Sequence, residues 1–294
     1  MKKLASAVLL VSLSGFAVSC RDEAARAEPE KLGGLTEVSE KALTAIRMEE
    51  MNWPDIKRAI ESGFTTVVVA VGSTEQHGPH LPTMTDARIG EDVAERVARK
   101  LGRALLARTI DVGLSEHHMA FAGTISFKAE TLLLIIRDYA ASLARHGFTR
   151  IVFIPMHGGN FPTVRQAIEE ARKAHPDIDI TGFTDVFGLL DLLARNSADY
   201  GVSMEAAGAH AGESETSMMM ALEGRLVAVD RFAPGYIGPF GEAGLKLMME
   251  KGMSAISANG ILGDPRTASA ERGEAYLERL ADFVVSMIGP KKGS

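Results

Sequence analysis

The chain has 294 residues, of which 46% are hydrophobic and 24% charged, a composition typical of a globular protein. Its net charge is −6 and its pI about 5.8, and it contains no long run of basic residues. This charge balance excludes nucleic acid as a partner.

The first 20 residues are predicted to be an export signal. Lys2 and Lys3 precede an apolar run, residues 4–18, that is too short to span a bilayer. Cys20, the only cysteine, follows small residues as in a bacterial lipoprotein cleavage site, so cleavage is expected to leave Cys20 as a lipidated N-terminus. The protein would then be exported from a bacterial cytoplasm and face the periplasm or the exterior, touching the membrane only through this lipid. Ordinary secretion with cleavage nearby is the alternative.

Residues 21–36 are predicted to be a tether, because they are charged, rich in alanine and interrupted by Gly33 and Gly34. Residues 37–294 then form one folded domain, a length that a single α/β domain can hold.

The most informative stretch is a predicted buried strand, residues 64–71, followed by a loop rich in ligand-type side chains. The loop carries Glu75, His77, His80 and Asp86. Imidazole and carboxylate together suit zinc, manganese or iron, and an aspartate can bridge two ions through its two oxygens. The alternative is an ordinary polar surface loop.

The rest of the domain repeats this order of strand, loop and helix, which predicts a largely parallel sheet flanked by helices. Helices are expected at residues 86–101, with Asp86 as the N-terminal cap, at 131–146 and at 163–175, and further strands at 150–155 and 178–183. His157 follows one of these strands. The carboxyl ends of parallel strands are where ligands bind.

A third cluster, residues 208–217, runs into the apolar residues 218–222 and is expected to begin a helix. Glu213 is interpreted as a carboxylate that complements the helix dipole. Glu215 lies on the register that enters the buried face, where a carboxylate needs a partner such as a metal ion.

The motif S-x-E-Q-H-G-x-H-L-P-x-x-T-D, formed by residues 73–86, resembles the signature of the creatininase family of metal-dependent amidohydrolases. The resemblance continues through residues 157–160, 210–217 and 263–266 and covers roughly residues 45–288. It implies a single-domain α/β/α sandwich and a homohexamer.

The resemblance also implies a set of metal ligands: Glu75, His77, Asp86, His157 and Glu215. Two divalent ions, zinc, manganese or iron, are expected on either side of Asp86, one held also by Glu75 and His157, the other by His77 and Glu215. In creatininase a metal-binding glutamate lies two residues after the histidine that corresponds to His157. Here that residue is Gly159, so Glu215 is inferred to complete the second site. His210 and Glu75 are the expected catalytic residues, with His210 passing a proton to the departing nitrogen.

The substrate pocket is inferred from the same resemblance. Its expected residues are Ser115, His118, Gly123, Thr124, Gly158 and Asn160. His117 has no place in the family pattern and is interpreted as an ordinary loop residue. Creatininase holds its flat substrate with a tyrosine and a tryptophan, and the corresponding residues here are Gly158 and Ala206, which argues against creatinine as the physiological substrate.

The predicted function is hydrolysis of a non-peptide C–N amide or lactam bond in a small substrate by a hydroxide that two metal ions activate. The alternative is a lipid-anchored metal-containing binding protein without turnover. A phosphate-cleaving enzyme is a weaker alternative, because the loops offer only Arg88 and Lys128 to meet phosphate.

Overall fold

The computed structural model describes residues 46–238 and 240–290. The predicted signal, residues 1–20, and tether, residues 21–36, lie outside the described residues. Within the described part of the chain, no helix combines the length and the apolar character that a membrane crossing requires.

A four-stranded parallel sheet forms the centre of the domain. Its strands are β1 (Thr66–Val71), β2 (Ala104–Leu106), β3 (Arg150–Pro155) and β4 (Asp179–Gly182), in the spatial order β2-β1-β3-β4. β1 and β3 pair along their whole length. Their apolar, β-branched sequences suit this position, because both faces of a parallel sheet are covered. The predicted α/β fold with a largely parallel sheet is confirmed.

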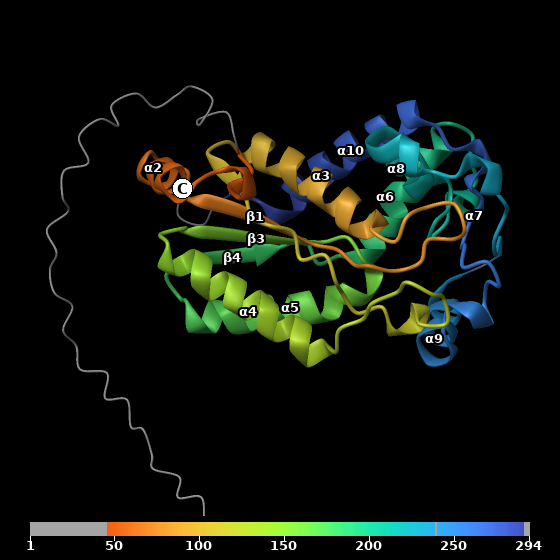
Figure 1. Cartoon of the computed structure of the whole chain (residues 1–294), viewed down its shortest axis with the longest axis horizontal. Helices are drawn as coiled ribbons and strands as arrows, with labels where there is room; N and C mark the ends of the chain where they lie inside the picture. Colours follow the sequence, from red (N-terminus) through yellow and green to blue (C-terminus); the bar gives the residue numbers. More distant parts are fainter. Residues whose placement is uncertain (1–45, 239, 291–294) are drawn as a thin grey trace, which may run out of the picture. The chain divides into compact units, whose positions relative to one another are not determined.

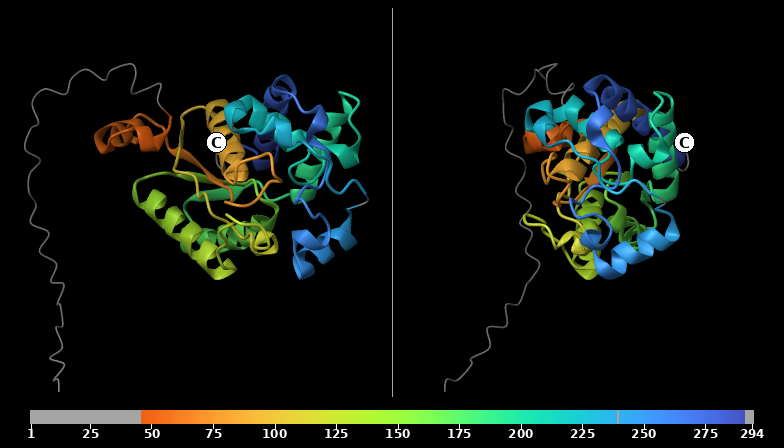
Figure 2. Two further views of the ribbon diagram at one scale, coloured as in Figure 1. Left: turned by 45° about the vertical axis from the view of Figure 1, so that its right-hand side comes forward. Right: turned by 90° about the vertical axis from the view of Figure 1, so that its right-hand side faces the viewer.

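Helices cover the two faces of the sheet. α3 (Thr85–Leu101) and α10 (Ala270–Ile288) lie on one face, and α4 (Ala129–Arg145) and α5 (Phe161–Ala174) lie on the other, an arrangement that the turned views also show (Figures 1 and 2). The remaining helices are α2 (Trp53–Glu61), α6 (Val186–Ala198), α7 (Met204–Ala207), α8 (Glu213–Glu223) and α9 (Glu242–Lys251). The short 3₁₀ helices are η1 (Met48–Glu50), η2 (Glu116–His118), η3 (Gly158–Asn160), η4 (Gly224–Leu226), η5 (Val229–Arg231), η6 (Met253–Ala255) and η7 (Pro265–Thr267).

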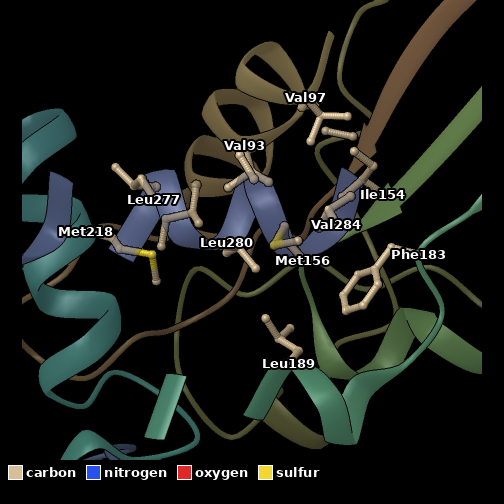
Figure 3. Close-up of a cluster of buried hydrophobic side chains, with 14 of the residues drawn as sticks. Val93, Val97, Ile154, Met156, Phe183, Leu189, Met218, Leu277, Leu280 and Val284 are labelled. Atoms are coloured by element: carbon tan, nitrogen blue, oxygen red, sulfur yellow. The ribbon is translucent and has the colours of Figure 1, made fainter. Parts of the chain in front are cut away.

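Alternate residues of β1 build two separate cores. Val68 and Ala70 pack in the cluster on the side of α3 and α10, whereas Val67 and Val69 pack in the cluster on the side of α4 and α5. Figure 3 shows the first cluster, where the α3 and α10 side chains meet Ile154 of β3. Burial from both sides holds the carboxyl ends of β1 and β3 in fixed positions.

The prediction that Asp86 caps its helix is wrong. α3 begins at Thr85, Met84 occupies the cap position without a side-chain hydrogen bond, and Asp86 lies within the first turn. The Asp86 carboxylate instead accepts a hydrogen bond from the Ser73 hydroxyl and faces the loop after β1.

A close helix contact gives a test of this packing. Gly273 of α10 lies against α8, where an added Cβ atom would sit 1.9 Å from the carbonyl oxygen of Ser217. We expect Gly273→Ala to lower the free energy of unfolding by about 1–3 kcal/mol, because the helices must separate to admit a methyl group. Urea denaturation measures this loss. Gly224→Ala is the control, since a Cβ there meets nothing within 4 Å. An unchanged stability of Gly273→Ala would contradict the packing described.

Candidate metal centre

Three segments bring histidines and carboxylates together at the carboxyl edge of the sheet. They are the loop after β1, the short segment after β3 that carries His157, and the start of α8. Because β1 and β3 are neighbours in the sheet, the segments that follow them lie side by side. The structure thus places all five predicted ligands in one cluster, in which Glu215 is partly buried and the others are buried: Glu75, His77, Asp86, His157 and Glu215.

Asp86 lies in the middle of this cluster and uses its two oxygens differently. Oδ1 is 3.0 Å from Nε2 of His77, and Oδ2 is 3.1 Å from Nδ1 of His157. The Ser73 hydroxyl donates a hydrogen bond of 2.8 Å to Oδ2 and fixes the carboxylate. Each oxygen of Asp86 therefore faces a different histidine.

Glu75 is fully buried, and neither of its oxygens has a hydrogen-bond partner within the described chain. Its Oε1 lies 3.3 Å from Nδ1 of His157. A buried carboxylate without hydrogen bonds is costly unless a cation compensates it. Ligands about 2.0–2.2 Å from one tetrahedral ion lie roughly 3.3–3.6 Å from one another, a range that includes this separation.

The backbone orients both predicted histidine ligands. His157 Nε2 donates to the carbonyl oxygen of Leu114 at 3.0 Å, and His77 Nδ1 donates to the carbonyl oxygen of Glu75 at 3.2 Å. The other nitrogen of each ring faces the carboxylates and becomes available to an ion when the ring is neutral. Fixing a ring through its second nitrogen is the usual arrangement of a histidine that binds metal.

Glu215 lies on the side of His77, with Oε2 3.9 Å from His77 Nε2. Its carboxylate accepts a hydrogen bond of 2.6 Å from the backbone of Ala211, a residue with a positive φ of 52°. Gly159 cannot carry a ligand in this structure, because a Cβ there would lie 2.4 Å from the carbonyl oxygen of Leu114. Glu215 is thus the carboxylate that the second half of the cluster has available.

The buried carboxylates shift the pKa values of the neighbouring histidines. Burial lowers the pKa of His77, but the Asp86 and Glu215 carboxylates outweigh it and raise the pKa to about 9. The pKa of His157 likewise lies well above its ordinary value, because Glu75 and Asp86 outweigh its burial. Burial raises the pKa of Glu215 to about 7. Protons on His77 and His157 thus compensate the ionised Glu75 and Asp86 in the metal-free protein, and divalent ions would displace these protons. The donor set fits zinc, manganese or iron.

His210 borders the same cluster. Its Nδ1 lies 3.8 Å from Oε1 of Glu75, and its ring lies 4.1 Å from that of His77. Nε2 donates to the carbonyl oxygen of Gln76 at 2.8 Å, which leaves Nδ1 as the acceptor. Burial and the neighbouring His77 lower the pKa of His210 well below its ordinary value, so that the ring is neutral. His210 can therefore accept a proton at Nδ1.

The predicted substrate residues do not all lie on an open surface. Ser115 and His118 are buried, Thr124 accepts a hydrogen bond from the Gln76 backbone, and Gly123 has a positive φ of 90°. Gly158 is exposed and has open space beside it.

Asn160 is engaged with the backbone. Its amide nitrogen donates to the carbonyl oxygen of Gly72 at 2.8 Å, and its oxygen accepts from the backbone of Leu114 at 3.0 Å. These bonds hold the end of β1 beside the loop that carries His118.

Sequence reasoning missed His117. This residue stacks on His157 with ring centroids 5.6 Å apart, and its ligand atom lies within 4.8 Å of ligand atoms of Glu75 and His157. It also lines a cavity of about 780 Å³. Gly159, Lys128 and Lys251 contribute to the same cavity, which therefore lies beside the cluster on the side of His117. The sequence offered only one signal, the position of His117 beside His118.

Glu213 is more deeply buried than the helix-dipole interpretation implied. Its carboxylate accepts hydrogen bonds from the hydroxyls of Ser197 at 2.7 Å, Ser217 at 3.0 Å and Tyr276 at 3.3 Å. It joins α6, α8 and α10. His80 likewise has a hydrogen-bond partner outside the cluster, since its Nε2 lies 2.9 Å from the Thr216 hydroxyl. Neither residue belongs to the candidate ligand groups found among the described residues.

A buried histidine and carboxylate cluster at the carboxyl edge of a parallel sheet, beside a cavity, defines a candidate metallohydrolase site. The creatininase family profile, described as creatinine amidohydrolase, matches residues 49–288. The chain therefore belongs to the creatininase family, as the sequence motifs predicted.

Individual relatives and solved structures support this family assignment. The mycofactocin precursor peptide peptidase of Mycobacterium ulcerans (strain Agy99) is 35% identical over 238 residues, covering 78% of this chain and 86% of the relative. The creatinine amidohydrolase of Pseudomonas putida is 27% identical over 249 residues, covering 78% and 90%. The structure titled "Creatininase Mn" and that of a mutant creatininase of "Zn-Zn type" are both 26% identical with a TM-score of 0.69. They cover 84% of this chain, and 100% and 99% of their own chains respectively. The chain is accordingly a creatininase-family amidohydrolase with candidate ligands for divalent metal.

Proposed function

We propose that the enzyme hydrolyses a non-peptide C–N amide or lactam bond in a small substrate, using two divalent ions of zinc, manganese or iron per chain. The position of Asp86 is the main support for two ions, because its two carboxylate oxygens face two different histidines. Glu75 and His157 would hold one ion with Asp86, and His77 and Glu215 the other. Bound ions of this kind lower the pKa of water and polarise the carbonyl that is attacked.

The protein's own residues would control position and proton movement. Ser73 holds the Asp86 carboxylate, and the carbonyl oxygen of Gln76 holds the His210 ring with Nδ1 toward Glu75. His210 accepts a proton at Nδ1 and passes it to the departing nitrogen. The Glu75 carboxylate favours proton uptake at this nitrogen and opposes the burial and the His77 ring that lower the pKa of His210.

The substrate would enter through the cavity beside His117 and Gly159. Gly158 and Ala206 replace the aromatic side chains that hold creatinine in creatininase, so creatinine is not expected to be a substrate. A short peptide is a second candidate, favoured by the 35% identity to a mycofactocin precursor peptide peptidase.

Turnover on a panel of small amides, lactams and short peptides tests the proposal. We expect hydrolysis of at least one compound, complete loss after chelation, and recovery when zinc, manganese or iron is returned. Binding of a panel compound without turnover by the metal-loaded protein would favour the alternative, a lipid-anchored binding protein. Turnover that survives complete metal removal would contradict the proposal.

Glu215 provides a test of the second ion. We expect Glu215→Gln to lose about one equivalent of metal, because an amide is a weaker ligand than a carboxylate, and to lose most of its activity. Elemental analysis measures the loss. Glu205→Gln is the matched control, since Glu205 is exposed on α7. If Glu215→Gln keeps the full metal content, then Glu215 is not a ligand.

We also propose a homohexamer, on the strength of the family membership. Light scattering on protein without the signal segment should give six times the mass of the chain at micromolar concentration. A monomer would contradict this assembly. Export and lipidation at Cys20 belong to the proposal as well and concern residues outside the described part of the chain.

A further inference from the structure

Gln76 lies between the two predicted ligands of the first loop, and its side chain contacts two histidines. Its amide nitrogen is 2.8 Å from Nδ1 of His118, 3.0 Å from Nε2 of His210 and 3.2 Å from the carbonyl oxygen of Gly260. The nitrogen has two hydrogens for these three neighbours. His210 Nε2 uses its own hydrogen to donate to the Gln76 backbone, so the amide hydrogens go to His118 and Gly260.

The orientation of the Gln76 amide is fixed on its other side. Its oxygen accepts a hydrogen bond of 2.9 Å from the backbone N–H of Gly78. A flipped amide would direct two donors at each other there and would place its oxygen against the carbonyl oxygen of Gly260. Gly260 also leaves the space that the amide fills, because a Cβ there would lie 2.1 Å from the amide oxygen. The amide nitrogen is thus held toward His118.

A fixed donor at Nδ1 determines where the proton of His118 lies. Nδ1 must accept, so the proton is on Nε2, the nitrogen that lies 3.4 Å from Oε1 of Glu75. His77 and His157 have the opposite arrangement when neutral, as metal binding requires, since each gives its remaining proton to a backbone carbonyl and leaves its other nitrogen to an ion. His118 therefore turns a hydrogen toward the cluster where the two predicted ligands, when neutral, turn lone pairs.

We propose that Gln76 is a positioning residue that keeps His118 as an N–H group facing Glu75 and thereby excludes His118 from the metal ligands. Distance alone does not distinguish these roles, because ligand atoms of Glu75, His118 and His210 lie within 4.8 Å of one another. The Nε2 proton of His118 orients the Glu75 carboxylate electrostatically, since 3.4 Å is long for a full hydrogen bond. This inference rests on the proposed metal site.

The direct test is the tautomer of His118 in zinc-loaded wild-type protein, read from the ¹⁵N chemical shifts of labelled histidines. We expect the Nε2–H form for His118 without bound zinc, and zinc on Nε2 of His77 and on Nδ1 of His157. An Nδ1–H form or a zinc-bound His118 would overturn the inference and leave the proposed function standing. Absence of zinc from every histidine would overturn the proposed function and the inference with it.

A variant tests the contribution of Gln76. Gln76→Met keeps the length of the side chain and removes the donor, so His118 can exchange its proton between the two nitrogens. We expect kcat to fall about 10–100-fold, the usual effect of disturbing the hydrogen bonds around a metal ligand, here Glu75 through His118, with little change in KM and with loss of the single Nε2–H signal. Gln166→Met, at an exposed position on α5, is the control and should leave both readouts unchanged. Full activity and an unchanged His118 tautomer in Gln76→Met would overturn the inference.

Discussion

Replacement of Asp86 by alanine is expected to remove both metal ions and all measurable turnover together. Asp86 is the one residue whose two oxygens face both predicted sites, at 3.0 Å from His77 and 3.1 Å from His157. Its loss removes a carboxylate from each ion, whereas loss of Glu215 affects only one. Elemental analysis and turnover on the amide panel measure the two effects in the same preparation.

Two comparisons make this result interpretable. Asp177→Ala, at an exposed loop position, is the matched control and should keep both metal and activity. The stability of Asp86→Ala should be compared with that of metal-free wild type, because bound metal itself stabilises the folded state. An Asp86→Ala protein that keeps one full equivalent would show that Asp86 does not join the two sites.

His210→Ala is expected to behave differently, with the metal content intact and kcat about 10²–10⁴-fold lower. The reason is that His210 Nδ1 lies 3.8 Å from Glu75 and the ring is held through the backbone of Gln76, an arrangement suited to moving a proton. Steady-state kinetics with metal analysis on the same sample separates the two properties. His146→Ala, at an exposed position after α4, is the control.

Two outcomes would change this account of His210. Loss of metal from His210→Ala would make His210 a ligand beside His77 and would contradict the ligand set proposed, in which Glu215 completes the second site, since His77, His210 and Glu215 form one candidate group. Full activity on the true substrate would contradict the proton transfer proposed, and only the family, the fold and the metal site would be supported.

The sequence predicted the centre of the fold because buried parallel strands have a distinctive composition. β3 spans the predicted residues 150–155, and β1 lies within the predicted 64–71. β2 was not predicted. It has only three residues, and three apolar residues carry no periodicity that separates a strand from a loop or a helix end.

The loop positions of the predicted ligands followed from the topology, since segments after neighbouring parallel strands must meet at one edge. The roles of Gln76, His117 and Glu213 could not be predicted in the same way. In the sequence, Gln76 looks like an ordinary loop residue between two ligands. Only the structure shows that its amide lies between His118 and Gly260. Glu213 looked like a helix-start carboxylate because the hydroxyls that bury it come from residues distant in sequence, Ser197 and Tyr276.

The metal content of the unmodified protein, purified without chelator, tests the central claim most directly. Glu75 is a buried glutamate without a hydrogen bond from residues 46–238 or 240–290, and Asp86 beside it has two different histidine neighbours. Two cations would compensate this arrangement. Elemental analysis should give close to two equivalents of zinc, manganese or iron per chain. A single equivalent would reduce the site to one ion, and a fully folded protein that binds no metal under any loading condition would contradict the account.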